Sequence, residues 1–190
     1  MRRLPLGYLP GAFCCRDEEI DGYLHDGNAA IDEETWNART YGVEDGAECA
    51  GYFTVPADAI RLNLQEAQET HSRYQSVPAI KLGRIGTCKR YKKQGVGDFI
   101  FDVVVGLARS MAANVGVRYV SVDALPQEWL VNRHKKRGFL VNDGEEEHRL
   151  RNTPRNELDG DRVISMRLDT WSVIPAAIAG VVWKTRWLAA

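Results

Sequence analysis

The chain has 190 residues, a length that suits one domain with its own hydrophobic core. Apolar residues make up 44% of it and charged residues 27%, a balance too apolar for a disordered protein. The net charge of −1 excludes a chain that is strongly basic or acidic throughout.

The first half of the chain alternates helix-like and strand-like stretches. Asp45-Gly46 is a dipeptide typical of a hairpin turn, and strand-like residues flank it on both sides. The expected elements are a helix over 17–36, strands over 40–43 and 49–55, a polar connection over 56–77 that is helical around 62–70, and a strand over 79–87.

The second half contains the clearest helix, residues 98–114, which carries one wide apolar stripe. Gly116 follows it and is interpreted as its C-terminal cap. The further elements are a strand over 117–124, a helix over 127–137, a strand over 139–141, a charged loop over 143–160 and a strand over 163–168. This order predicts a mixed α/β layered fold.

The N-terminus and the cysteines indicate where the protein works. Pro5 and Pro10 interrupt the first residues, which lack the apolar core of a signal peptide. The longest apolar run, residues 173–183, is too short to span a bilayer. The four cysteines show no metal-ligand spacing and are expected to be reduced thiols. We therefore expect a cytoplasmic protein with no metal and no membrane partner.

Charge is unevenly distributed along the chain. Residues 81–137 hold 12 Lys and Arg against 4 Asp and Glu, whereas residues 1–80 hold 6 against 14. The basic segment indicates an anionic ligand. The alternative is a solvated basic face that the acidic first segment balances in space.

One loop of the basic segment carries the main chemical signal. Gly95-Val96-Gly97 stands between the strand over 79–87 and the helix over 98–114, and Lys92 and Lys93 precede it. Glycines let a backbone approach a ligand closely, and unpaired amides at a helix N-terminus attract anions. The loop lacks the residues of a Walker loop and the third glycine of a dinucleotide fingerprint. Its glycines, its lysines and the helix start suit a pyrophosphate. The alternative is a tight loop before a helix, with no ligand.

At this loop the sequence resembles the GCN5-related N-acetyltransferase superfamily. KKQGVG at 92–97 is similar to the family's Gln/Arg-x-x-Gly-x-Gly/Ala, with Lys92 in place of the usual Gln or Arg. KLGRIGTCKRY resembles the strand that binds the pantetheine arm, VRYVSVDAL the next strand, and HKKRGF the family's Tyr-x-x-x-Gly-Phe. The resemblance implies an α/β fold with a mixed, mostly antiparallel central sheet, a splayed strand pair and flanking helices.

The resemblance also implies acetyl-CoA as cosubstrate and indicates which residues bind it. Strand amides near Ile85, Gly86 and Thr87 would hold the pantetheine arm. The loop would hold the pyrophosphate through Lys92, Lys93, Gln94, Gly95, Val96, Gly97 and Asp98.

The family's tyrosine, which protonates the departing thiolate, falls at His134. Histidine can act as a general acid, so His134 is the predicted catalytic residue. The alternative is that His134, with its basic neighbours, is a cation that complements the dipole at a helix end.

The acceptor is predicted to be a primary amine. No carboxylate stands out as general base, Asp123 and Glu128 being the nearest. An α-amine, with a pKa of about 8, is partly neutral at neutral pH without a strong base, whereas a lysine amine is not.

From Asp17 through Phe53 the chain resembles the acetyltransferase toxins of type II toxin–antitoxin pairs, which acetylate the α-amino group of aminoacyl-tRNA. With charged tRNA as acceptor, the expected phosphate contacts are Lys89, Arg90, Arg133, Lys135, Lys136 and Arg137.

The prediction is thus an acetyl-CoA-dependent N-acetyltransferase with one domain over 17–170. Residues 1–16 are expected to be an N-terminal extension, and residues 171–190 an apolar tail that packs on the domain or on a partner. An antitoxin and a second copy of the chain are the other expected partners. The alternatives are a coenzyme-A-binding but inactive regulatory or assembly protein of the same fold, and an RNA-binding protein without chemistry. Against the latter, no RNA-reading aromatic motif is present.

Overall fold

The computed structural model describes residues 1–4, 13–153 and 162–171. Its helices are α1 (Glu18–His25), α2 (Asn28–Glu34), α3 (Leu64–Glu69), the 3₁₀ turn η1 (Lys89–Tyr91), α4 (Val96–Ala112), α5 (Glu128–Lys135) and α6 (Gly144–Asn152). Its strands are β1 (Arg2–Arg3), β2 (Arg39–Asp45), β3 (Glu48–Val55), β4 (Ala57–Arg61), β5 (Ser76–Leu82), β6 (Ile85–Thr87), β7 (Tyr119–Ala124), β8 (Leu140–Val141) and β9 (Ile164–Asp169).

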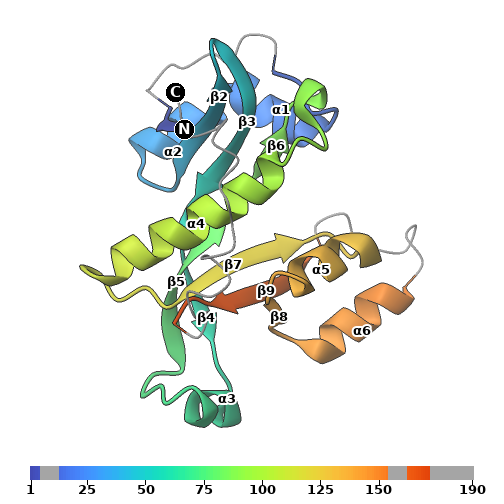
Figure 1. The fold of residues 1–190 in the computed structure, drawn as a ribbon. Coiled ribbons are helices and arrows are strands. Elements are labelled where there is room, and N and C mark those ends of the chain that lie inside the picture. Colours follow the sequence, from blue (N-terminus) through green and yellow to red (C-terminus); the bar gives the residue numbers. More distant parts are fainter. Residues whose placement is uncertain (5–12, 154–161, 172–190) are drawn as a thin grey trace.

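The strands form two sheets that meet at a fork. The first sheet has the order β1-β2-β3-β6 and is antiparallel. The second has the order β4-β5-β7-β9-β8, in which only β5 and β7 run parallel. Figure 1 shows α4 crossing both sheets, with α1 and α2 near β2 and β3. The predicted mixed, mostly antiparallel fold with a splayed strand pair is confirmed, because β5 and β6 are consecutive but belong to different sheets.

Thr54 fixes the fork. Its amide donates to the Arg84 carbonyl at 2.9 Å, its carbonyl accepts from Gly83 at 3.0 Å, and its hydroxyl accepts from the Arg84 amide at 2.9 Å. A Cβ on Gly83 would lie 2.5 Å from the Thr54 hydroxyl, so only glycine fits between the two strands. These bonds move the chain from the second sheet to the first within two residues.

Helix α4 joins the two sheets. It packs against β3, β5, β6 and β7 and buries its apolar face, which includes Val96, Ile100 and Val104. The helix predicted over 98–114 begins and ends two residues earlier in the structure, at Val96 and Ala112. Its C-cap is Ala113 rather than the expected Gly116. No helix in the described ranges is both long and apolar enough to cross a bilayer.

Three expected elements are each divided or extended in the structure. The helix expected over 17–36 is two helices, because Gly27 takes a left-handed φ of 80° between them. The strand expected over 79–87 is β5 and β6. The connection expected from residue 56 begins with β4, whose residues are mostly exposed.

Helix α6 replaces part of the expected charged loop over 143–160. The Asp143 side chain accepts hydrogen bonds from the amides of Glu145 and Glu146, which caps the helix start. Three glutamates occupy its first turn and Arg149 and Arg151 its last turn, so the charges complement the helix dipole.

The two ends of the described chain take part in the domain. Among the described residues of the expected extension over 1–16, Arg2–Arg3 form β1 and Phe13 is buried in the core. The apolar tail was expected over 171–190. Of it, only Trp171 is described, and its side chain is 85% exposed.

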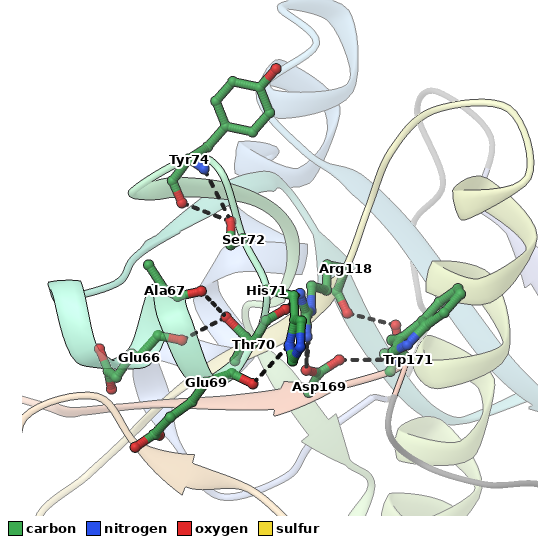
Figure 2. Close-up of polar contacts among 11 residues, drawn as sticks. Glu66, Ala67, Glu69, Thr70, His71, Ser72, Tyr74, Arg118, Asp169 and Trp171 are labelled. Atoms are coloured by element: carbon green, nitrogen blue, oxygen red, sulfur yellow. Dashed lines mark hydrogen bonds and ion pairs between the residues drawn. The ribbon is translucent and has the colours of Figure 1, made fainter.

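Arg118 anchors the end of β9, at the opposite end of the second sheet from the fork. Its guanidinium donates to the Asp169 carboxylate at 2.7 Å and to the Thr70 carbonyl at 2.8 Å, as Figure 2 shows. Its carbonyl accepts from the Thr170 hydroxyl at 2.6 Å. One residue therefore ties the end of α3, the start of β7 and the end of β9 together.

Candidate active site

A cleft of about 850 Å³ opens where the two sheets separate. The fork supplies its floor, from Lys81 to Thr87. Helix α5 and the start of α4 form one wall, and the segment that leads into α1 and α2 forms the other. The cleft therefore has a half beside α4 and α5 and a half beside α1 and α2. We call them the coenzyme half and the acceptor half, after the two ligands that the family resemblance predicts.

The edge of β6 presents free backbone groups to this cleft. Cys88 donates to the Ala50 carbonyl and Thr54 to the Arg84 carbonyl, which fixes the alternation of bonds between β6 and β3. By that alternation Gly86 bonds to β3, whereas the amides of Ile85 and Thr87 point away from it. Of the three predicted pantetheine contacts, Ile85 and Thr87 are therefore the ones with available amides.

The predicted pyrophosphate loop has the geometry of an anion site. Lys93 and Gly95 take left-handed φ values of 64° and 87°, and α4 begins directly after them. No side chain caps the helix start. The first amides of α4, from Val96 to Asp98, are thus free to bind an anion at the positive end of a 17-residue helix.

The side chains of this loop are mostly engaged elsewhere. The Lys92 ammonium donates to the Cys15 carbonyl at 2.9 Å, which holds the N-terminal segment against the loop. The Gln94 amide donates to the Arg90 carbonyl at 2.8 Å, and the Val96 side chain is buried. Apart from Lys93, whose side chain is exposed, the loop therefore has backbone amides rather than side chains available for the predicted anion.

Arg133 brings a cation to the same place. Its guanidinium lies 3.0 Å from the Asp98 carboxylate and 3.0 Å from the point where a Cβ on Gly97 would stand. Burial raises the pKa of Asp98, but hydrogen bonds from Arg133 and Arg137 outweigh it, so the pKa is lowered overall. Asp98 therefore stays charged and holds both arginines at the coenzyme half.

His134 lies in the core rather than on the cleft wall. Its ring packs edge-on against Phe101 and Phe139, with centroids 5.2 and 5.6 Å away, and its Nδ1 has no hydrogen-bond partner. Burial, followed by the charges of Arg133 and Arg137, lowers the pKa of His134 to about 4. The ring is therefore neutral at neutral pH, which contradicts the interpretation as a helix-end cation. A buried neutral ring also gives the predicted acid role no support, and that role stays a prediction.

The acceptor half is built from charged side chains that the sequence did not single out. The Arg84 guanidinium stacks on the Tyr23 ring at 4.4 Å and lies 3.5 Å from Glu19. The Tyr23 hydroxyl donates to Asp32 at 2.9 Å. Lys81, on β5, forms a close ion pair with Asp123, on β7. Asp123, one of the two carboxylates that the sequence placed nearest the site, is thus engaged in an ion pair.

The six predicted tRNA contacts are mostly paired with acidic side chains. Arg90 pairs with Glu48 and Lys135 with Glu147, while Arg133 and Arg137 share Asp98. Lys89 and Lys136 are exposed. Of these partners only Glu48 belongs to residues 1–80, so these pairs do not show the acidic first segment balancing the basic one.

Three tryptophans have largely exposed side chains: Trp36, Trp129 and Trp171 are 81%, 62% and 85% exposed. Trp129 also lines the cleft, at the coenzyme half. Within the described ranges, no three His, Cys, Asp or Glu side chains group as a metal site.

Comparison with known proteins finds solved structures with a similar fold. No protein-family model matches this sequence, and no curated protein matches it significantly. Among solved structures, a tyrosine-to-phenylalanine mutant of KacT matches with 20% identity and a TM-score of 0.66, over 87% of this chain and 89% of that one. AtaT complexed with acetyl-methionyl-tRNAfMet matches with 18% identity and a TM-score of 0.65, over 85% and 87%.

A third match is a tyrosine-to-phenylalanine mutant of the AtaT toxin, bound to the C-terminus of its antitoxin AtaR and to acetyl-CoA. It has 18% identity and a TM-score of 0.66, over 90% of this chain and 92% of that one. This chain has the fold of these toxins. The resemblance to the GCN5-related acetyltransferases is thereby confirmed for the fold.

Proposed function

We propose that this protein is an acetyl-CoA-dependent N-acetyltransferase that acts on the α-amino group of aminoacyl-tRNA. The observation that carries the proposal is the cleft itself. Free strand amides at Ile85 and Thr87 and the uncapped start of α4 lie on one continuous surface. A strand edge suits the amides of a pantetheine arm, and a helix N-terminus suits a pyrophosphate.

The chemistry of such a site is direct transfer from thioester to amine. Bound at the fork, the thioester would face the acceptor half, where the amine enters. Placing the two reactants side by side accounts for a large part of such catalysis. Residues that hold acetyl-CoA would be Ile85 and Thr87 for the arm and the loop over 92–98, with Arg133, for the pyrophosphate.

The choice of acceptor rests on two observations. First, AtaT, which shares this fold, has been captured with acetyl-methionyl-tRNAfMet. Second, three of the four carboxylates that line the cleft have close partners: Asp32 bonds to Tyr23, Asp123 pairs with Lys81 and Asp17 caps α1. The fourth, Glu19, lies 3.5 Å from the Arg84 guanidinium. An α-amine, which is partly neutral at pH 7, needs less help from a base than a lysine amine does.

The second candidate is a coenzyme-A-binding protein without activity. It is favoured by the placement of His134 and by the fact that no tyrosine is among the cleft-lining residues of the described chain. In that case the fold would serve regulation or assembly. An antitoxin would be a partner of either candidate, since AtaT binds the C-terminus of AtaR.

One assay separates these candidates. The purified protein is mixed with radiolabelled acetyl-CoA and with charged tRNA, free amino acids or small amines in parallel, and label transfer is measured. The proposal expects transfer to charged tRNA and release of the coenzyme A thiol. Binding of acetyl-CoA by calorimetry without transfer to any amine supports the inactive candidate, and no binding contradicts both.

A further inference from the structure

The ion pair of Lys81 and Asp123 stands at the point where the two sheets separate. Leu82 and Val122 form the last paired position of β5 and β7, so Lys81 lies one residue before the fork and Asp123 one residue beyond it. Both side chains line the cleft and are about 30% exposed. A charged pair with this placement is reachable from the cleft yet largely shielded from water.

The pair lies on the acceptor side of the sheet. Lys81, Ser121 and Asp123 alternate with Leu82 and Val122, whose side chains are buried in the core that α4 covers. The polar residues therefore point to the other face. On that face Ser121 donates to Asp58, and in β9 Ser165 pairs across from Asp123 and Arg167 across from Ser121.

Four other ionisable residues that line the cleft have partners of their own. Asp17 caps α1, Asp32 accepts from Tyr23, Lys92 donates to the Cys15 carbonyl, and Glu19 lies 3.5 Å from Arg84. Burial keeps the His134 ring neutral and away from the cleft. The Cys15 thiol lines the cleft, but burial and a hydrogen bond with Asp21 raise its pKa to about 12. The Arg84 and Arg133 guanidinium groups do not release protons in proteins.

We propose that Lys81 and Asp123 form a proton shuttle for acetyl transfer, with Asp123 taking the proton of the acceptor amine and Lys81 protonating the leaving thiolate. The proposal rests on the proposed function and assigns to this pair the role for which the sequence predicted His134. It names two catalytic residues on strands, positioned by the register of β5 and β7.

The proton balance of the step closes within the pair. Attack of the neutral amine on the thioester carbon forms the C–N bond, and the Asp123 carboxylate takes one proton from that nitrogen. The C–S bond then breaks, and the Lys81 ammonium gives a proton to the thiolate. Transfer of the proton from Asp123 to the Lys81 amine restores the ion pair. Amine and acetyl-CoA become amide and coenzyme A thiol, and no other reactant is needed.

The decisive variant is Lys81→Arg. It keeps the positive charge and can keep the ion pair, but a guanidinium does not give up its proton at neutral pH. If Lys81 donates a proton, the kcat of Lys81→Arg with the amine that the parent uses should fall by at least about a hundredfold. A purely structural pair expects kcat close to that of the parent. Acetyl-CoA affinity, measured by calorimetry, is expected to stay within about threefold.

Two further variants and a control complete the test. Asp123→Asn is expected to lower kcat as well, and Lys81→Met combined with Asp123→Asn should be no worse than the more damaging single change, since the two act as a unit. Asp169→Asn removes the partner of Arg118 at the far end of the same strands. It should lower the melting temperature and leave kcat unchanged.

The outcomes divide cleanly. An active parent whose Lys81→Arg variant is folded, binds acetyl-CoA and keeps its kcat overturns the shuttle and leaves the proposed function intact. A parent that transfers acetyl to none of the amines overturns the function and the shuttle together. Should Lys81→Arg melt below the assay temperature, Asp123→Asn decides, and unchanged kcat there again overturns the shuttle.

Discussion

The coenzyme half of the cleft offers backbone amides, whereas the acceptor half offers charged side chains. In the first, Ile85, Thr87 and the start of α4 present N–H groups whose positions follow from strand register and helix geometry. In the second, Lys81, Asp123 and Arg84 present charges that could be replaced without changing the backbone. Substitutions in the acceptor half could therefore change the acceptor while the backbone of the coenzyme half continues to suit the same coenzyme.

This difference also decides what a sequence can reveal. Backbone recognition requires glycines at fixed positions, and these leave a pattern in the sequence. Side-chain recognition requires only that suitable residues meet in space, and these come here from β5, β7, α1 and α2. The predictions below test whether the two halves are as separable as their construction suggests.

The largest expected effect comes from Gly95→Glu in the coenzyme half. Gly95 has a φ of 87°, and no atom lies within 4 Å of a Cβ placed there. The new side chain would strain the backbone and bring negative charge to an anion site, so acetyl-CoA affinity should fall by at least about a hundredfold. Gly95→Ala isolates the strain and should cost about tenfold. Calorimetry measures both, and unchanged affinity of Gly95→Glu would place the coenzyme elsewhere.

The next effect concerns His134, which supports the wall of the coenzyme half. Its native pKa of about 4 lies below the value of about 6.5 expected in the unfolded chain, so the unfolded state binds more protons between these values. The free energy of unfolding should therefore decrease as pH falls, by about 2 kcal/mol between pH 7 and pH 5 from this residue. Urea unfolding of the parent and of His134→Phe at both pH values isolates it. Equal pH dependence in the two proteins would contradict the assigned burial.

Arg133 tests which half its charge serves. It was expected to contact tRNA, but it lies beside Gly97 and Asp98. Arg133→Gln should weaken acetyl-CoA binding roughly tenfold, the value of one charge-assisted contact, and change the KM for charged tRNA much less. Arg137→Gln is the matched control, because Arg137 shares Asp98 and lies over the Phe101 ring. If Arg133→Gln raises the KM for charged tRNA and leaves acetyl-CoA affinity unchanged, Arg133 contacts tRNA rather than the coenzyme.

The smallest effect is expected from Arg90, which pairs with Glu48 on an exposed surface. Exposed ion pairs contribute little, and this charge is already balanced. Arg90→Ala should therefore change kcat/KM with charged tRNA by less than about threefold. A larger loss that disappears at high salt would show that tRNA phosphate competes with Glu48 for this arginine.

Much of the fold could be predicted because its signals are local. The apolar stripe of α4 and the glycines before it gave the helix and the loop to within two residues. The fork was implied by family resemblance, and its physical cause is Thr54, whose bonds to Gly83 and Arg84 carry no local pattern. Helix α6 was missed because capping and charge order stabilise it, whereas the expectation of a helix relied on apolar periodicity.

In the candidate site, too, the local features could be predicted and the contacts between distant residues could not. The backbone contacts of the coenzyme half were predicted from glycine spacing and resemblance. The Lys81 and Asp123 pair was not, because 42 positions separate its members and only the parallel pairing of β5 with β7 joins them. His134 stands where the family motif places it, yet its environment depends on Phe101 and Phe139, which come from other elements.

The position of the Arg118 anchor has a practical consequence for binding measurements that require the protein to be immobilised or labelled with a dye. Because Tyr119 pairs with Asp169, β9 ends a full strand length from the cleft. A surface linkage or dye introduced at Trp171 is therefore remote from the cleft. Cys14 is the opposite case, since its carbonyl accepts from the Lys89 amide at 2.9 Å beside the pyrophosphate loop. A thiol-reactive dye on Cys14 should sense the coenzyme, while the same dye at position 171 should serve as the silent reference.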